Sequence, residues 1–317
     1  MKRWCLWTAL FSAWCGSATA QELPSLADLV EKIQPAVVNI SSSPLPESQT
    51  EAEESLPGVV SSNPLLDDYF NPGKPARQSL GSGFIIDKAG YIITNHHVID
   101  QAQEIDVTLF DGRQTQAELV GKDAKTDIAL IKIDMKEELP AAKLGNSDDI
   151  RVGDWVVAVG NPFGLGNSVS AGIVSAKSRD IETGPYDNFI QTDASINQGS
   201  SGGPMFNMAG EVIGINTAIF STNGGNMGIG FAVPITLVDF VIKELKSKGK
   251  VERGWLGLKI QANSADIAGS VSQPQAKGVV VSAVTENSSA AKAGLEAGDI
   301  IAVSYTHLRA HETGRNL

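Results

Sequence analysis

The most constraining feature of the sequence is a series of short apolar runs between Gly81 and Pro234, separated by turn residues such as Asp111-Gly112. The clearest runs are Gly83–Ile86, Tyr91–Thr94, Val107–Phe110, Ile128–Ile131, Trp155–Val159 and Val212–Ile215. Strands at this spacing indicate an antiparallel sandwich or barrel, because βαβ units would need helical segments between them. The sequence therefore predicts an all-β domain over this part of the chain.

The N-terminus has the order of a secretory signal. Basic residues at Met1–Arg3 are followed by the mostly apolar Trp4–Trp14 and by small residues ending at Ala20. The apolar stretch is shorter than the roughly twenty residues that a membrane span needs. The bulky residue before Cys15 also argues against a lipoprotein. We expect cleavage after Ala20 and no stable membrane anchor.

Cleavage would remove both cysteines of the chain, Cys5 and Cys15. The mature protein would then contain no disulfide, no thiol nucleophile and no cysteine-ligated metal. The formal net charge is -11, and the sequence has no long Lys/Arg run. Nucleic-acid binders gain affinity by neutralising phosphates, so this charge argues against nucleic acid as a partner.

A long polar stretch interrupts the N-terminal part of the chain. Leu23–Gln34 is predicted to be a short helix stopped by a proline, and Ala36–Ile40 a strand. Residues 41–80 have the composition of a flexible loop. Within it, Leu65–Phe70 is apolar, which predicts that this patch docks against another surface.

Histidine is the first candidate for chemistry. Outside the C-terminal tail the chain has only His96 and His97, which follow an apolar strand. Any imidazole base must be one of these two, and only one can point inward from extended backbone. A histidine at the end of a strand can equally be a hydrogen-bonded structural residue.

A serine between glycines is the second candidate. In Gln198–Pro204, the glycines allow backbone N–H groups to converge beside a serine oxygen, as in an oxyanion hole. The same pattern also suits an ordinary turn. The third candidate is Asp127, which heads the apolar run Ile128–Ile131 and needs a partner there.

Three motifs, Thr94–Ile99, Thr126–Leu130 and Gly199–Pro204, resemble in order and spacing those of the HtrA/DegP (Do-like) periplasmic serine proteases. The resemblance extends from about residue 23 to about residue 303. It implies an all-β, chymotrypsin-like double six-stranded β-barrel at 21–253, followed by an incomplete PDZ-like α/β domain at 254–303. It also implies a periplasmic location and no cofactor.

The resemblance assigns a catalytic triad of Ser201, His97 and Asp127, in which the imidazole takes the serine proton and the carboxylate orients the imidazole. The N–H groups of Gly199 and Ser201 would form the oxyanion hole. The sequence departs from the family at two positions that are usually Asn there, His96 and Ser200. The nucleophile could be placed one residue earlier, but the Ser-Gly-Gly-Pro register favours Ser201.

The resemblance also suggests a substrate strand and pocket walls. The expected substrate-binding residues are Ser200, Thr217, Ala218, Ile219, Phe220, Ser221, Ile229, Gly230 and Phe231. Ile229 leaves room for a small aliphatic side chain, and no acidic residue is present in 216–221 or 228–232. We therefore expect cleavage after Val, Ala or Ile.

The second domain is expected to follow the predicted helix Pro234–Lys248 and the polar Gly249–Gly254. Its opening resembles a PDZ carboxylate-binding loop and strand. The expected peptide-binding residues are Leu256, Gly257, Leu258, Lys259 and Ile260. The match ends at Val303, and residues 304–317 are interpreted as a foreign tail, a sequencing or assembly artefact. His307 and His311 in this tail lack a third ligand, so no metal site is predicted.

The function that the resemblance implies is degradation of unfolded or misfolded envelope proteins by acyl-enzyme catalysis, with possible chaperone activity. Expected partners are such proteins, their C-terminal peptides and further copies of the chain, as a homotrimer or a larger cage. The alternative is a non-catalytic peptide-binding chaperone on the same fold. Intact His97, Asp127 and Ser201 argue against that alternative.

Overall fold

The computed structural model describes residues 25–44, 79–100, 102–161, 166–184, 186–221, 225–262 and 279–301. The chain divides into two compact units, residues 1–251 and 252–317. Three predicted features lie outside the described residues: the secretory signal at 1–20, the apolar patch at 65–70 and the tail at 304–317.

The first barrel of the first unit is built from residues 37–132. Its strands are β1 (Val37–Pro44), β2 (Ser79–Asp87), β3 (Tyr91–Asn95), β4 (Ala102–Thr108), β5 (Gln114–Gln116), β6 (Glu118–Asp123) and β7 (Ile128–Lys132), in the order β5-β4-β1-β2-β3-β7-β6. Only Ala117 separates β5 from β6, and its N–H donates to the carbonyl oxygen of Ile105 on β4 (2.8 Å). Residues 114–123 thus act as one interrupted strand, which pairs with β4 and with β7 and closes a six-stranded barrel.

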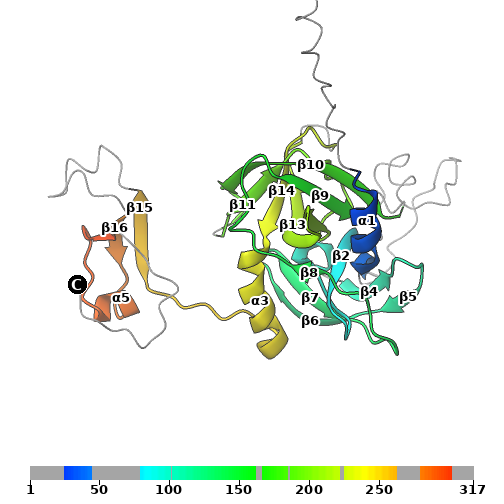
Figure 1. Ribbon diagram of the computed structural model, residues 1–317. Helices are drawn as coiled ribbons and strands as arrows, with labels where there is room; N and C mark the ends of the chain where they lie inside the picture. Colours follow the sequence, from blue (N-terminus) through cyan, green and yellow to red (C-terminus); the bar gives the residue numbers. More distant parts are fainter. Residues whose placement is uncertain are drawn as a thin grey trace, which may run out of the picture. The chain divides into compact units, whose positions relative to one another are not determined.

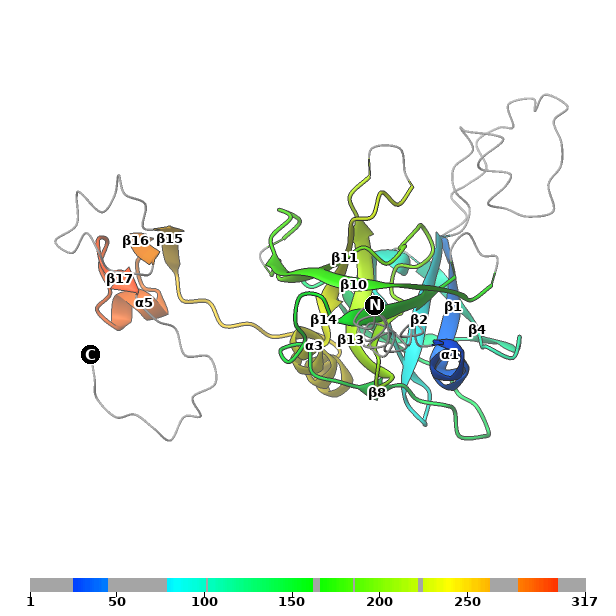
Figure 2. The ribbon, with the colours of Figure 1, turned by 45° about the horizontal axis from the view of Figure 1, so that its top comes forward.

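The second barrel is built from residues 143–234. Its strands are β8 (Lys143–Leu144), β9 (Trp155–Gly160), β10 (Ser168–Arg179), β11 (Phe189–Thr192), β12 (Pro204–Asn207), β13 (Glu211–Ile219) and β14 (Gly230–Pro234). The order is β12-β9-β10-β11-β14-β13-β8, and a further β12–β13 pairing closes a ring of six to which β8 is added. The 12-residue β10, the long green strand labelled in Figure 2, pairs with β9 on one edge and with β11 on the other. The predicted double six-stranded barrel is confirmed.

The ends of the predicted loop at 41–80 are wrong. Ser41–Pro44 continue β1, and Ser79 and Leu80 open β2. β1 lies between two partners, so that Ser41 is opposite Leu80 on β2 and Asp106 on β4. Hydrogen bonding on both edges of the strand overrides the weak strand propensity of the serines. Local composition cannot reveal this pairing, because the partner strands lie elsewhere in the sequence.

Strand β7 shows how the core is shared. Ile128 and Leu130 pack into an apolar cluster that includes both barrels, whereas Ala129 and Ile131 fill the first barrel. All four side chains are fully buried. Successive residues of a strand face opposite sides, so a strand buried on both faces reads as an unbroken apolar run. The residue at the start of this strand, Asp127, therefore lies at the junction of the barrels.

Two helices pack on this unit. The predicted N-terminal helix is α1 (Ala27–Ile33), and Pro35 lies in the first turn of the 3-10 helix η1 (Gln34–Ala36), where a missing N–H is tolerated. The predicted helix at 234–248 is α3 (Ile235–Lys248), which lies beside β6 and β7 (Figure 1). No helix within the described ranges is long and apolar enough to cross a membrane.

The described residues of the second unit form a small sheet and a short helix. Its strands are β15 (Leu258–Ala262), β16 (Val279–Val284) and β17 (Ile300–Ile301), in the order β15-β16-β17. The helix is α5 (Ser289–Lys292), whose N-cap hydroxyl, Ser288 Oγ, accepts the Ala291 N–H. Within the described residues β15 pairs only with β16.

Candidate active site

The site forms where β3 ends and β7 begins. The two strands are antiparallel, with Asn95 opposite Ile128. His97 lies in the 3-10 turn η2 (His96–Val98) that follows β3, and Asp127 directly precedes β7. Because the end of one antiparallel strand meets the start of the other, the pairing brings the predicted base and the predicted acid together.

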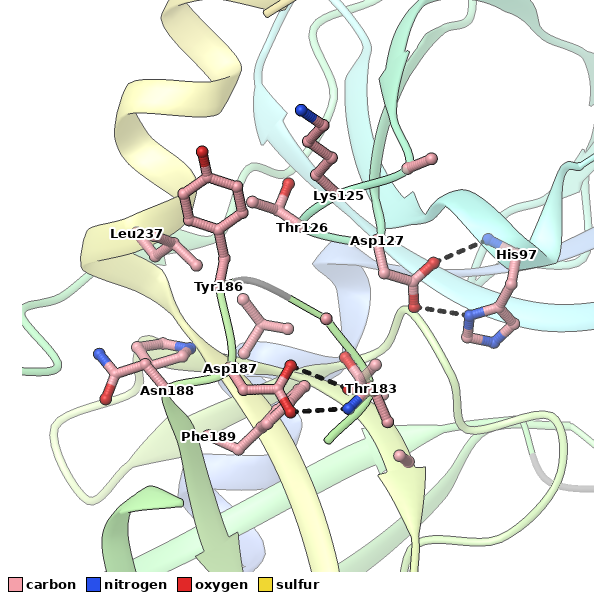
Figure 3. Close-up of a pocket in the computed structure, with 16 residues that line it drawn as sticks. His97, Lys125, Thr126, Asp127, Thr183, Tyr186, Asp187, Asn188, Phe189 and Leu237 are labelled. Atoms are coloured by element: carbon pink, nitrogen blue, oxygen red, sulfur yellow. Dashed lines mark hydrogen bonds and ion pairs between the residues drawn. The ribbon is translucent and has the colours of Figure 1, made fainter. Parts of the chain in front are cut away.

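The Asp127 carboxylate holds His97 by two contacts, both drawn in Figure 3. Oδ2 lies 2.6 Å from Nδ1 of His97, and Oδ1 accepts the His97 backbone N–H at 2.9 Å. His96 instead places its Nε2 3.4 Å from Oδ1 of Asp100. The structure thus brings His97, and not His96, to the predicted acid. With the Nδ1 proton directed to the carboxylate, Nε2 is the basic nitrogen of a neutral His97 ring.

The predicted nucleophile, Ser201, lies in the loop between β11 and β12. Gly199 and Gly202 of this loop have φ angles of +91° and +84°. An added Cβ at Gly202 would lie 2.2 Å from the carbonyl oxygen of Ser82. Left-handed backbone and close approach of another chain segment both require glycine, which explains the glycines around the serine.

Ser82, which sequence reasoning missed, joins this loop to the first barrel. It is fully buried, its hydroxyl donates to the carbonyl oxygen of Gly199 (2.7 Å), and its N–H donates to that of Ser201 (2.8 Å). The same hydroxyl accepts the N–H of Asn161 (2.8 Å). The available signal was the Gly81-Ser82-Gly83 sequence, in which glycines on a strand indicate close backbone approach.

The next feature of the site is the pair of N–H groups predicted to form an oxyanion hole. The N–H groups of Gly199 and Ser201 have no hydrogen-bond partner among the described residues. The hydroxyl of Ser201 donates to the carbonyl oxygen of Thr217 (3.4 Å) rather than to His97. Oγ1 of Thr217 is 3.1 Å from the side-chain nitrogen of Asn95, the residue that ends β3. The serine hydroxyl therefore lies in the same site as the histidine, joined to β3 through one threonine.

A pocket of about 320 Å³ opens beside this pair. Two predicted substrate residues, Thr217 and Ala218 of β13, line it together with His97 and Asp127. Its opposite wall is formed by Thr183, Gly184 and Tyr186–Asn188 (Figure 3). The lining combines the polar pair with apolar surface, as ligand-binding pockets commonly do.

The other predicted substrate residues form an adjoining strand pair. Ile219 on β13 is opposite Gly230 on β14, and Phe231 is opposite Ala218. Beyond the strands, the N–H of Phe220 donates to the carbonyl oxygen of Ile229 (3.0 Å), and the Phe220 side chain is 57% exposed. The hydroxyl of Ser221 donates to the carbonyl oxygen of Gly225 (2.7 Å).

The sequence analysis did not identify the residues that pack against the β13–β14 strand pair. An added Cβ on Gly230 would lie 2.9 Å from Cδ1 of Ile196, which is 2% exposed. The side chain of Asn226 donates to the carbonyl oxygen of Ile196 (2.9 Å), and its N–H donates to Oδ1 of Asn197 (3.1 Å). No local pattern marks these residues, because their partners lie about thirty positions away.

Ser200 is 6% exposed, and it lines a second cavity of about 170 Å³ with Gly160 and Asn216. Neither Ser200 nor Ser201 is among the residues that line the pocket beside His97. The substrate contact expected of Ser200 therefore stays a prediction. Elsewhere, no three His, Cys, Asp or Glu side chains in the described part of the chain are grouped to hold a metal ion.

One carboxylate organises the opposite wall of the pocket. Asp187 accepts the backbone N–H groups of Ile181 (3.0 Å) and Thr183 (2.9 Å), and Oγ1 of Thr183 donates to it at 3.0 Å (Figure 3). Burial by itself would raise the pKa of Asp187, but these hydrogen bonds outweigh it and lower the pKa below its ordinary value.

The second unit presents the predicted peptide-binding segment as a loop and an edge strand. The carbonyl oxygens of Leu256 and Gly257 accept the N–H groups of Ala290 (2.9 Å) and Thr285 (2.8 Å). Gly257 has a left-handed φ of +79°. Leu258, Lys259 and Ile260 lie in β15, whose edge away from β16 has no strand partner in the described part of this unit, and an unpaired edge is where a peptide strand can add.

Comparison with known proteins agrees with this architecture. A family model for trypsin-like peptidase domains matches residues 81–215, and one for PDZ domains matches residues 244–304. A probable periplasmic serine endoprotease DegP-like from Pseudomonas savastanoi pv. phaseolicola is 47% identical over 300 residues, covering 90% of this chain and 62% of the relative. The corresponding protein of Bartonella henselae is 41% identical over 327 residues, covering 93% of this chain and 65% of the relative.

Solved structures give the same result. The structure of the HtrA-type protease AlgW with a tripeptide is 42% identical, with a TM-score of 0.73, covering 87% of this chain and 82% of that one. The serine endoprotease from Yersinia pestis is 36% identical, with a TM-score of 0.61, covering 87% and 81%. The fold is thus that of a trypsin-like serine peptidase followed by a PDZ domain. The chain belongs to the HtrA/DegP family of serine proteases. It spans about 62% of the length of the first curated relative.

The contacts of Asp187 predict a pH-dependent stability. A carboxylate whose pKa is lowered by folding stabilises the fold above its ordinary pKa of 3.8, and this contribution is lost as the pH falls through the lower folded value. The difference in melting temperature between wild type and Asp187→Asn should therefore be largest near neutral pH and shrink in acid below 3.8. The matched control is Asp134→Asn, whose side chain is 91% exposed and lies outside the pocket. A difference that stays constant with pH would contradict this account.

Proposed function

We propose that the protein is a serine endopeptidase that cleaves polypeptides through an acyl-enzyme intermediate. The observation that carries the proposal is the 2.6 Å contact between Nδ1 of His97 and Asp127, with the Ser201 hydroxyl in the same site. In the reaction, Ser201 Oγ turns from the Thr217 carbonyl toward Nε2 of His97. His97 takes its proton as the oxygen attacks the peptide carbonyl carbon.

The remaining steps use groups already in place. The N–H groups of Gly199 and Ser201 donate hydrogen bonds to the negative oxygen of the tetrahedral intermediate, and each such donor contributes about 2.7–4 kcal/mol. His97 then delivers its proton to the leaving amine as the C–N bond breaks. Water, deprotonated by the same imidazole, hydrolyses the acyl-enzyme and restores Ser201. Asp127 stabilises the imidazolium at each proton transfer.

The proposed substrates are unfolded or misfolded proteins of the periplasm. The curated relatives are named periplasmic serine endoproteases, and the structure of AlgW contains a bound tripeptide. An extended segment could pair with the exposed end of β13 near Phe220, which only an unfolded chain can supply. The C-terminus of such a chain would dock on β15 at Leu256–Ile260. Export after cleavage at Ala20, and assembly as a homotrimer or larger cage, belong to the same proposal.

A non-catalytic chaperone on the same fold is the weaker candidate. A protein that only binds peptide does not require an imidazole oriented by a carboxylate beside a glycine-flanked serine. The assembled His97–Asp127 pair therefore favours hydrolysis.

Replacement of the nucleophile tests the proposal directly. Ser201→Ala should lower kcat for casein hydrolysis by at least about 10⁴-fold, because no other hydroxyl can form the acyl-enzyme. Ser200→Ala is the matched control, since its side chain faces the second cavity, and it should keep casein hydrolysis within about threefold of wild type. Equal hydrolysis by wild type and Ser201→Ala would reject the triad.

The strand pair β13–β14 predicts the residue preference before the cleaved bond. We expect cleavage after Val, Ala or Ile, because the segments 217–221 and 229–231 carry no acid to attract a basic side chain. Ile196 fills the space beside Gly230, so Ile196→Ala should shift the preference toward larger side chains by about tenfold. Mass spectrometry of a digested peptide library measures both. Strong preference for Arg or Lys would overturn the assignment.

A further inference from the structure

Asn95 contacts both barrels at the site, and it has no role in the proposed mechanism. It is the last residue of β3, immediately before the two histidines, and its side chain is completely buried. Its Nδ2 donates to the backbone carbonyl oxygen of Asp127 (2.8 Å) and to Oγ1 of Thr217 (3.1 Å). A single amide group therefore connects the acid on the first barrel with a strand of the second.

The contact to Asp127 falls on a left-handed backbone. Asp127 has a φ of +55°, in a region that few residues with a Cβ occupy, although aspartate enters it more readily than most. Its carbonyl oxygen accepts both Nδ2 of Asn95 and the N–H of His96 (3.0 Å). Its carboxylate contacts His97. Three consecutive residues, 95 to 97, thus hold this aspartate, and its carboxylate direction follows from the backbone conformation that these contacts fix.

The contact to Thr217 reaches the nucleophile. Oγ1 of Thr217 accepts a hydrogen bond from Nδ2 of Asn95, and the backbone carbonyl oxygen of Thr217 accepts one from the hydroxyl of Ser201. Thr217 also lines the pocket beside His97. Through Asn95, the position of the acid is tied to the strand that accepts the serine and borders the substrate pocket.

The oxygen of the Asn95 side-chain amide lowers the stability of the folded state. Oδ1 of Asn95 is buried and has no hydrogen-bond partner among the described residues. A buried acceptor without a partner destabilises the folded state, so an apolar residue of the same shape would suit folding at this position about as well. The presence of asparagine at this position is therefore better explained by the two groups that its side-chain nitrogen holds in place than by a contribution to stability.

We propose that Asn95 is a positioning residue of the active site, which holds Asp127 against His97 and couples that pair to the Thr217 strand. This role rests on the proposed peptidase activity. Asn95 does not touch the reacting atoms, so its loss should act on the geometry of the pair and not on the binding of substrate.

The first test replaces the amide by an apolar group of similar shape. Asn95→Leu should lower kcat for a peptide substrate by about 100-fold, the effect of a misplacement of about 1 Å, with KM within about twofold. The melting temperature should change little, because the unpaired oxygen leaves with the two hydrogen bonds. The control is Ser147→Ala, which removes a buried bond to Thr236 Oγ1 (2.7 Å) outside the site and should lower the melting temperature without lowering kcat. A rise in KM at unchanged kcat would overturn the proposal.

A double-mutant cycle separates positioning from general damage. With an activated ester as substrate, Asn95→Leu should cost about 100-fold in the wild-type background but less than about threefold in Asp127→Ala, since the acid to be positioned is then gone. Equal losses in the two backgrounds would refute the role. If Asn95→Leu does not fold, the smaller Asn95→Ser, which cannot span both acceptors, takes its place in the same cycle.

A readout without turnover distinguishes failure of this inference from failure of the proposed function. The Nδ1 proton of His97, shared with Asp127, gives a low-field proton resonance that should shift upfield or disappear in Asn95→Leu and persist in Ser147→Ala. An unchanged resonance in Asn95→Leu refutes the positioning role even if the protein proves to be a peptidase. A wild type that shows this resonance, and loses it in Asn95→Leu, but does not cleave peptides refutes only the activity.

Discussion

The antiparallel pairing of β3 with β7 is the interaction on which the site depends. It places the turn that carries His97 beside the residue that precedes Ile128, and both strands are held in place by burial on two faces. The carboxylate of Asp127 then needs only a local left-handed bend to reach the imidazole. A shift of one residue in this register would turn every side chain of β7 to the opposite face, which the buried isoleucines oppose.

The second requirement is that two separately closed barrels meet with accuracy at the serine loop. A few hydrogen bonds fix how the two barrels meet at this loop. Ser82 of the first barrel binds the loop at Gly199 and Ser201, and Asn95 reaches Thr217 of the second barrel. The interface around these hydrogen bonds is apolar, and the hydrophobic effect that stabilises it is not directional. The hydrogen bonds set the relative placement that acyl transfer requires, and the apolar cluster supplies the stability.

The architecture was predictable because it depends on local patterns. Short apolar runs marked the strands, and the apolar spacing at 235–245 marked α3. The three motifs gave the order of the predicted site residues. What could not be predicted depends on partners distant in the sequence. The serines at 41–43 form a strand only because two neighbours pair with them. The fixing of the pocket wall by Asp187 is likewise a product of loop geometry.

In the proposed mechanism, His97, Asp127 and Ser201 act as one nucleophilic unit. Covalent labelling with an organophosphonate, followed by peptide mass spectrometry, tests this unit, because the reagent modifies only a serine activated by a neighbouring base. We expect one adduct per chain, on Ser201, and its loss in His97→Ala. Labelling of a different serine, or equal labelling of wild type and His97→Ala, would contradict it.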